Sequence, residues 1–333
     1  MSNWKGRKVL ITGAEGFIGS HLVERLLAAG ADVRAFVWYN SFSRWGWLEP
    51  PEVPREILQS VEIFPGDIRD PRRVREAVAG CDTVFHLCSL IAIPFSYVAP
   101  DSYVQTNVTG ALNVLNACRD EGGVRLVHTS TSEVYGSARR VPIDETHPLQ
   151  GQSPYSASKI GADMLAESFH RSFGLQVATV RPFNTYGPRQ SARAVIPTIL
   201  AQVHSGATRI RLGALHPTRD FTYVADTVEG MVRVAECEGA VGRVVNVGSG
   251  HEIAIGDLVR LILDVTGREA DVTVETDRVR PPASEVDRLC CDRSVARDMV
   301  GWEPVVGLRE GIERTSRWVA ANLQFFKPDV YNR

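Results

Sequence analysis

The stretch that decides the fold is Val9-Leu10-Ile11-Thr12-Gly13-Ala14-Glu15-Gly16-Phe17-Ile18-Gly19. Its first four residues are apolar or β-branched and predict a strand, whereas residues 18–29 predict an amphipathic helix. The glycines lie between the two, where a helix N-terminus offers free N–H groups to a pyrophosphate. Gly13 permits a tight turn, Gly16 lets the backbone approach phosphate, and Gly19 lets the helix pack on the strand. The segment therefore predicts a dinucleotide-binding βαβ unit.

The alternation of short strands and helices continues through the first half of the chain, as in a parallel sheet with helical crossovers. Further strands are predicted at 33–37, 61–64, 83–87, 126–130 and 176–181, and helices at 104–120, 155–173, 196–204, 224–237, 255–266 and 308–323. We expect an α/β fold, a Rossmann-type doubly wound parallel sheet with a smaller C-terminal α/β substrate lobe. The predicted Rossmann domain covers residues 1–181, with 224–250 returning to it, and the substrate lobe covers 182–223 and 251–333.

Composition restricts the class of partner. Hydrophobic residues make up 44% and charged residues 23% of the 333, which is typical of globular proteins. A formal net charge of -2 offers no broad attraction for nucleic acid or an anionic membrane, and no apolar run is long enough for a membrane span. The six cysteines form no CxxC pair, so neither a metal site nor a disulfide framework is predicted. Without a signal-peptide pattern, we expect a cytoplasmic protein.

A second motif, Tyr155-Ser156-Ala157-Ser158-Lys159, opens a predicted helix. Tyr155 and Lys159 are four positions apart and so project from the same helical face. Beside a cationic nicotinamide, the ammonium of Lys159 favours the tyrosinate and lowers the pKa of the phenol toward working pH. This pair predicts an enzyme that uses a nicotinamide cofactor.

The GxxGxxG loop and the YxxxK pair together resemble the extended short-chain dehydrogenase/reductases of the NAD-dependent epimerase/dehydratase family. The resemblance implies that Asp67, after the third strand, bonds adenine and that Lys159 bonds the nicotinamide ribose. The acidic residue that usually ends the second strand and selects NAD is missing, since Val37 stands there. We favour NAD without excluding NADP. Asn40 and Ser41, in a predicted loop at 38–55, are candidates for binding the adenosine ribose. The full set of predicted cofactor-binding residues is Gly13, Gly16, Phe17, Ile18, Gly19, Asn40, Ser41, Asp67, Ile68, Leu87, Tyr155 and Lys159.

The third motif, residues 130–136, follows a predicted strand and contains Thr131, Ser132 and Glu133. Thr131 resembles the hydroxyl residue that holds the substrate O4 beside the tyrosine. Simple 4-epimerases of the superfamily usually have no acid at position 133, because they only remove and return a hydride at C4. A carboxylate there can abstract the C5 proton acidified by a transient C4 ketone, which predicts a 4,6-dehydratase. Where dTDP-glucose dehydratases have Asp-Glu, Ser132-Glu133 resembles GDP-mannose dehydratases. The resemblance implies that Glu133 donates the proton it took to the departing C6 hydroxyl, with Ser132 or water as a relay.

Three residues are predicted to bind the substrate besides Thr131. Asn184 lies in Arg181-Pro182-Phe183-Asn184-Thr185-Tyr186-Gly187-Pro188-Arg189, a segment that resembles the family's sugar-diphosphate contact. Arg219 and Arg280 are candidates for the diphosphate, because a guanidinium fork matches phosphate oxygens. The segments 39–48 and 278–286 and the terminal Tyr331-Asn332 resemble nucleotide-activated N-acetylglucosamine 4,6-dehydratases of legionaminic acid biosynthesis. This implies UDP- or GDP-N-acetylglucosamine as substrate, and the wider family implies a homodimer through the helices at 104–120 and 155–173.

Three other functions remain open. A UDP-glucuronate decarboxylase shares Ser-Glu-Val-Tyr-Gly, but usually has Ala-Cys-Tyr-Asp-Glu-Gly-Lys where this chain has Ser-Pro-Tyr-Ser-Ala-Ser-Lys. A 4-epimerase is disfavoured by Glu133. A cofactor-binding scaffold without catalysis has no physical need for Thr131, Glu133, Tyr155 and Lys159 together.

Overall fold

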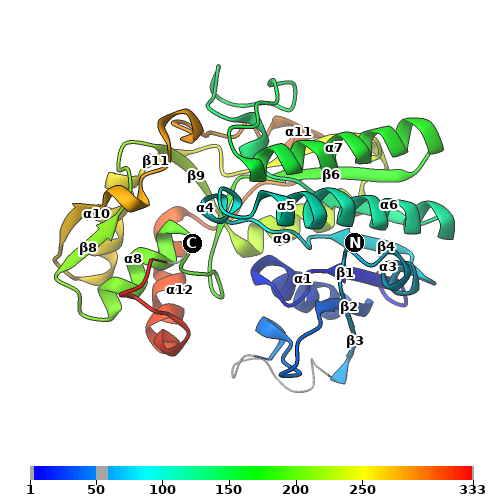
Figure 1. Ribbon diagram of the computed structural model, residues 1–333, viewed down its shortest axis with the longest axis horizontal. Coiled ribbons are helices and arrows are strands. Elements are labelled where there is room, and N and C mark those ends of the chain that lie inside the picture. Colours follow the sequence, from blue (N-terminus) through cyan, green and yellow to red (C-terminus); the bar gives the residue numbers. More distant parts are fainter. Residues whose placement is uncertain (1–3, 50–58, 332–333) are drawn as a thin grey trace.

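The computed structural model describes residues 4–49 and 59–331, and its main element is a seven-stranded parallel sheet (Figure 1). The strand order is β10-β6-β5-β4-β1-β2-β3, which reverses direction beside β1 and confirms the doubly wound α/β prediction. Ligands of such sheets bind outside the carboxyl ends of the strands at this reversal. The strands are β1 Lys8–Thr12, β2 Asp32–Trp38, β3 Val61–Gly66, β4 Thr83–His86, β5 Arg125–Thr129, β6 Gln176–Pro182 and β10 Val244–Val247.

Helices cover both faces of this sheet. The strands carry apolar residues on both sides, so that in β1 Ile11 joins one hydrophobic core while Leu10 joins the other. The first core lies under α1 and α9, and the second under α3, α6 and α7. These helices are α1 Phe17–Ala28, α3 Pro71–Val78, α6 Gly110–Glu121, α7 Pro154–Phe173 and α9 Val224–Glu236.

Smaller sheets and further helices form the side of the molecule opposite β3 (Figure 1). One sheet has the order β11-β9-β7 and the other pairs β12 with β8. Because β10 pairs with β6, the chain returns to the large sheet at residues 244–247. The proposed division into two domains remains a prediction. The elements there are β7 Asn184–Tyr186, α8 Val195–His204, β8 Arg209–Leu212, β9 Thr218–Tyr223, β11 Glu252–Ala254, α10 Ile255–Thr266, β12 Asp271–Val274 and α12 Leu308–Ala321. Helix α11, Ser294–Val300, instead packs against β10 and α9 of the large sheet.

The helix predicted at 104–120 is interrupted, which the sequence pattern did not indicate. Short helices α4 Ile93–Ser96 and α5 Pro100–Tyr103 lead into a π-helical turn at Val104–Thr109, and α6 begins only at Gly110. Asn107 in this turn is buried, and its side chain bonds Leu90 N, Leu90 O and Ser158 Oγ at 2.8–2.9 Å. The extra residue of the turn therefore directs a polar side chain into the protein beside α7.

The predicted loop after β2 is described only to residue 49, so residues 50–55 of it lie outside the described residues. A 3-10 turn at Gly46–Leu48 places the Trp47 ring against Trp318 of α12 at 5.4 Å and against Phe325 at 5.2 Å between centroids. Aromatic edge-to-face contacts of this kind are favourable. The loop is thus attached to the last part of the chain.

Within residues 4–49 and 59–331, no helix is long and apolar enough to cross a membrane. The same residues contain no group of His, Cys, Asp and Glu side chains that could hold a metal ion.

Two buried histidines lie side by side under the carboxyl edge of the sheet. His86 of β4 and His128 of β5 are in register, and their rings are 5.8 Å apart. His86 Nδ1 is 2.8 Å from Thr12 Oγ1, and His128 Nε2 is 3.1 Å from the Asp163 carboxylate. Burial lowers the pKa of both imidazoles, even though Asp163 acts in the opposite direction on His128.

We predict that stability falls when the pH is lowered from 7 to about 5.5. The unfolded chain binds protons at His86 and His128 near pH 6.5, whereas the folded chain binds them only at lower pH. These two histidines together should lower the free energy of unfolding by at most about 3 kcal/mol per pH unit in this window, and His21 and His204, whose pKa values burial also lowers, act in the same direction. Urea unfolding at several pH values measures it, with exposed His216→Gln as the control that leaves the slope unchanged. A constant stability over this window would contradict the prediction.

Candidate active site

The N-terminus of α7 positions Tyr155 and Lys159. Ser153 and Ser156 form a capping box there, and Pro154 occupies the first helical position, which fixes where the helix begins. Both functional side chains are buried, at 7% and 3% exposure. Lys159 Nζ donates a hydrogen bond of 2.7 Å to the carbonyl oxygen of Thr129, at the end of β5. The helix and the strand end are thereby held together.

Thr131, Ser132 and Glu133 follow directly after β5. A 3-10 turn begins at Ser132, and Thr131 Oγ1 caps it by accepting a hydrogen bond of 3.2 Å from Glu133 N. Glu133 is only 9% exposed. Since an acid in a loop is usually solvated, burial of this carboxylate indicates a position inside a site.

Electrostatic interactions show that these residues share one site. Burial raises the pKa of the Tyr155 phenol, a hydrogen bond with Thr131 acts to lower it, and the charge of Glu133 raises it further. The Glu133 charge also acts on the Arg219 guanidinium. The structure therefore brings together the predicted Thr131, Glu133, Tyr155 and Arg219.

The pKa values differ in direction from the simplest expectation for the tyrosine–lysine pair. The largest effect on the pKa of the Tyr155 phenol is burial, which raises it, and not the charge of the nearby ammonium. Burial also lowers the pKa of Lys159 to about 8, against the charge of Asp163. Lys159 thus stays mostly protonated at neutral pH, while Tyr155 needs further positive charge before it can act as a base.

A buried polar network behind the site was not predicted from the sequence. Asp163, 3% exposed, accepts hydrogen bonds from Ser130 Oγ at 2.8 Å and from Arg181 at 2.9 and 3.1 Å, besides its contact with His128. Burial alone would raise the pKa of Asp163, but His128 and Arg181 hold it below its usual value. The network ties α7, β5 and β6 together directly under Thr131. Its sequence signal was the spacing of four from Lys159, which places Asp163 on the same helical side.

The glycine-rich loop is packed so closely that side chains do not fit at Gly13 and Gly19. A Cβ at Gly19 would lie 2.1 Å from Gly13 O, and one at Gly13, where φ is +70°, would lie 3.0 Å from the Cys88 backbone. Gly16 is the N-cap of α1 and has no side chain over the helix N-terminus. Backbone N–H groups of the first turn, with Phe17 and Ile18, can therefore approach a pyrophosphate. Leu87 is adjacent to this loop, because a Cβ added at Gly13 would lie 3.3 Å from the Leu87 carbonyl carbon.

Of the residues predicted near adenosine, some form hydrogen bonds or ion pairs within the protein, one is exposed and one is buried in the core. The Asn40 side chain closes its own loop by bonding Phe42 N, Arg44 N and Arg44 O, while Ser41 is exposed. The Asp67 carboxylate pairs with Arg69 at 2.6 Å. Ile68 is 1% exposed and packs in the core next to Gly110. Cofactor contacts of these four remain predictions.

Two of the predicted substrate residues, Arg219 and Arg280, lie beside a carboxylate that the sequence analysis missed, Glu285. Arg219 donates 3.1 Å to Glu285 and 2.7 Å to Val286 O, and Arg280 lies 3.5 Å from the same carboxylate. Arg280 NH1 makes no hydrogen bond, and buried Asn184 Oδ1 has no partner either. The guanidinium group of Arg280 can donate to an anionic ligand, whereas Asn184 Oδ1 is an acceptor and fits a ligand hydroxyl.

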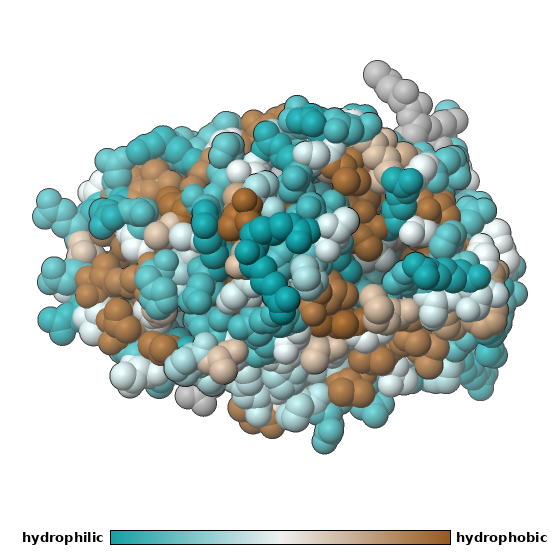
Figure 2. Space-filling model, turned by 90° about the horizontal axis from the view of Figure 1, so that it is seen from above, coloured by the Kyte–Doolittle hydropathy of each residue, from teal (hydrophilic) through white to brown (hydrophobic). Residues whose placement is uncertain are grey.

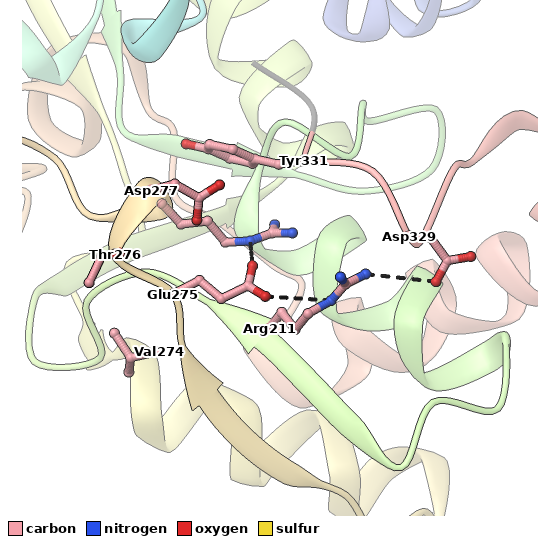
Figure 3. Close-up of a pocket in the computed structure, with 8 residues that line it drawn as sticks. Arg211, Val274, Glu275, Thr276, Asp277, Asp329 and Tyr331 are labelled. Carbon is pink, nitrogen blue, oxygen red and sulfur yellow. Dashed lines mark hydrogen bonds and ion pairs between the residues drawn. The ribbon is translucent and has the colours of Figure 1, made fainter.

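An open hollow of about 530 Å³ lies beside β8 and β12 (Figure 3). In it Arg211 reaches toward Glu275 and Asp329, with N–O distances of 3.9 and 3.7 Å. The Arg278 guanidinium lies 4.6 Å from the ring centroid of Tyr331. Two of the segments with the narrower resemblance are thus in contact, while Asn332 lies outside the described residues.

Comparison with known proteins places the chain among nucleotide-sugar enzymes. Residues 10–315 match the family model described as GDP-mannose 4,6 dehydratase. The chain is 34% identical over 325 residues to dTDP-glucose 4,6-dehydratase of Streptomyces antibioticus, covering 96% of this chain and 94% of the relative.

Solved structures that resemble this chain also include a nucleotide-sugar dehydratase and an epimerase. A double mutant of DesIV, a dTDP-glucose 4,6-dehydratase from Streptomyces venezuelae solved with NAD bound, has a TM-score of 0.82 and 29% identity over 96% of this chain and 99% of that one. Epimerase Mth375 from Methanothermobacter thermautotrophicus has a TM-score of 0.86 and 28% identity, covering 96% and 94% of the two chains.

We predict that Asp163→Asn destabilises the protein by about 3–5 kcal/mol, because it leaves the buried Arg181 charge uncompensated. Chemical denaturation measures the free energy of unfolding. Asp144→Asn, in an exposed ion pair with Arg140, is the matched control and should have little effect. Equal stability of the two variants would show that the network contributes nothing beyond a surface pair.

Proposed function

The chain belongs to the nucleotide-sugar 4,6-dehydratase family, and from this we propose that it converts UDP- or GDP-N-acetylglucosamine into the 4-keto-6-deoxy sugar, with NAD as cofactor. The observation that carries this proposal is the buried carboxylate of Glu133 beside Tyr155 and Thr131. A reaction confined to C4 has no use for such a group, whereas loss of water across C5 and C6 needs a base at C5.

Protons are moved by side chains of this chain. Tyr155 takes the proton of the sugar O4, which Thr131 holds, while Lys159 keeps a positive charge nearby. Glu133 then takes the C5 proton, which the ketone at C4 acidifies. The C6 hydroxyl leaves as water with the proton from Glu133, either directly or through buried Ser132.

The chemistry that NAD supplies when bound is reversible acceptance of a hydride, so that oxidation at C4 and reduction at C6 consume no cofactor. Support for NAD comes from the glycine-rich loop and from the DesIV neighbour solved with NAD. The loop and the first turn of α1 bind the pyrophosphate, and Lys159 bonds the nicotinamide ribose.

Substrate binding is assigned to Asn184, Arg219 and Arg280. Arg219 lies close enough to Glu133 and Arg280 to interact with both, and Arg280 NH1 has no hydrogen-bond partner, which supports a diphosphate bound next to the reacting sugar. The N-acetylglucosamine part of the proposal rests on the segments at 39–48 and 278–286 and on Tyr331, of which Arg278 and Tyr331 are in contact.

Epimerases share this fold, as the Mth375 neighbour shows, so the fold alone does not separate the two reactions. Burial of Glu133 at the reacting centre favours dehydration. Decarboxylation of UDP-glucuronate is the second alternative reaction, and an assay has to distinguish it from dehydration.

We further propose a homodimer that buries the outer faces of α6 and α7. Val104, Met164 and Phe173 are 48%, 44% and 55% exposed on the turn before α6 and on α7. Figure 2 shows the molecule from above the view of Figure 1, and brown hydrophobic patches lie on that face among hydrophilic residues. Burial of such side chains stabilises association.

Purified protein incubated with NAD and either UDP- or GDP-N-acetylglucosamine should yield a product lighter by one water, measured by mass spectrometry. UDP-glucuronate is the comparison substrate, from which carbon dioxide should not be lost. An unchanged mass with an altered sugar configuration would replace dehydration by epimerisation.

Glu133→Gln should lower kcat by about 100- to 10,000-fold, because it removes the base at C5. NAD binding should be unchanged, and incorporation of solvent deuterium at C5 should be lost. Tyr155→Phe, the comparison variant, should abolish oxidation at C4 itself. Deuterium incorporation at the normal rate in Glu133→Gln would remove Glu133 as the base.

A further inference from the structure

The carboxyl end of β2 lacks the acidic residue that usually accepts hydrogen bonds from the adenosine ribose. Val37 is fully buried at this position, and Trp38 follows it as the last residue of the strand. A carboxylate nevertheless lies there. It belongs to Glu15, between the first two glycines of the glycine-rich loop.

Glu15 reaches the end of β2 through its side chain. Its Oε1 accepts a hydrogen bond of 2.8 Å from Trp38 N, which is the amide next to the missing acid. Its Oε2 is buried and accepts no hydrogen bond. Burial raises the pKa of this carboxyl, against the N–H of Trp38. A buried carboxylate oxygen without a donor is unfavourable, so a ligand hydroxyl at this point would satisfy it.

The loop after β2 holds Glu15 in place. Trp47 N donates 3.0 Å to Glu15 O, and Gly46, at φ +53°, comes so close that a Cβ there would lie 2.7 Å from the same oxygen. Gly46 is therefore required by this contact as well as by its backbone conformation. The position of the carboxylate is defined by both neighbouring segments.

Other polar groups at this edge have partners. Asp67 pairs with Arg69, whose guanidinium also lies 5.5 Å from the Trp38 ring centroid. The Asn40 amide is used to close its loop. Glu15 Oε2 is the acceptor left with unused capacity among these three side chains.

We propose that Glu15 accepts the hydrogen bonds of the adenosine ribose hydroxyls and selects NAD over NADP, in place of an acidic residue at the end of β2. This inference rests on the proposed use of a nicotinamide dinucleotide. A 2′-phosphate at the same place would meet the negative charge of Glu15 in a partly buried position, where repulsion is strong. The glycine-rich loop thus contributes both the pyrophosphate site and the ribose acceptor.

Equilibrium binding of NAD and of NADP to the full chain, measured by isothermal titration calorimetry, tests this. Glu15→Gln keeps an acceptor for Trp38 N but removes the charge. We expect NAD binding to weaken about 10- to 100-fold, as for loss of a hydrogen bond to a charged group, and NADP binding to be unchanged or tighter. Glu49→Gln is the matched control, because Glu49 is an exposed carboxylate that accepts from Trp45 N at 2.8 Å in the same loop.

A second measurement needs no variant. The wild-type chain should bind the NAD analogue that lacks the adenosine 2′-hydroxyl more weakly than NAD, and Glu15→Gln should not distinguish the two. Equal binding of both by the wild type, or a Glu15→Gln variant with unchanged NAD affinity and unchanged NAD to NADP ratio, overturns this inference alone. A wild-type chain that binds no NAD overturns the proposed function together with it.

Discussion

The close approach of α1 to the loop after β1 is the constraint on which the site depends. At position 19 the helix leaves no space for even a Cβ, since it would lie 2.1 Å from Gly13 O. This contact fixes the N-terminus of α1 over the carboxyl edge of the sheet, where the strand order reverses. From the same loop Glu15 reaches β2, and Gly13 touches the end of β4 at Cys88. One backbone contact therefore sets the geometry of three strands relative to one helix.

The other half of the site contains buried ionisable side chains. Glu133, Lys159 and Asp163 are each at most 9% exposed, and such groups are stable only when they are paired or hydrogen-bonded. Asp163 accepts hydrogen bonds from Ser130 and Arg181, whereas Glu133 is the carboxylate that we propose as the base at C5. The hydrogen-bonded Asp163 therefore stabilises the fold beneath the site, whereas Glu133 is the group proposed to react.

Much of this arrangement could be predicted from local sequence patterns, because local chemistry determines it. Short continuous runs of apolar and β-branched residues located the strands, and the spacing of Tyr155 and Lys159 identified the helix face. The π-helical turn at Val104–Thr109 was missed because one extra residue hardly changes an apolar pattern. Glu15 and Glu285 were missed for another reason. Their partners, Trp38 and Arg219, are 23 and 66 residues away, so only the folded chain brings them together.

The contact of Trp47 with Trp318 and Phe325 also has a consequence for how the molecule is made. The ribosome makes the β1–α1–β2 unit well before α12, so the indole of Trp47 lacks Trp318 and Phe325 as partners until that later segment has been made. The loop after β2 is therefore packed only once α12 and the short helical turn at Leu323–Phe325 have been made. Until then, the newly made N-terminal half exposes an apolar loop of the kind that chaperones bind during translation.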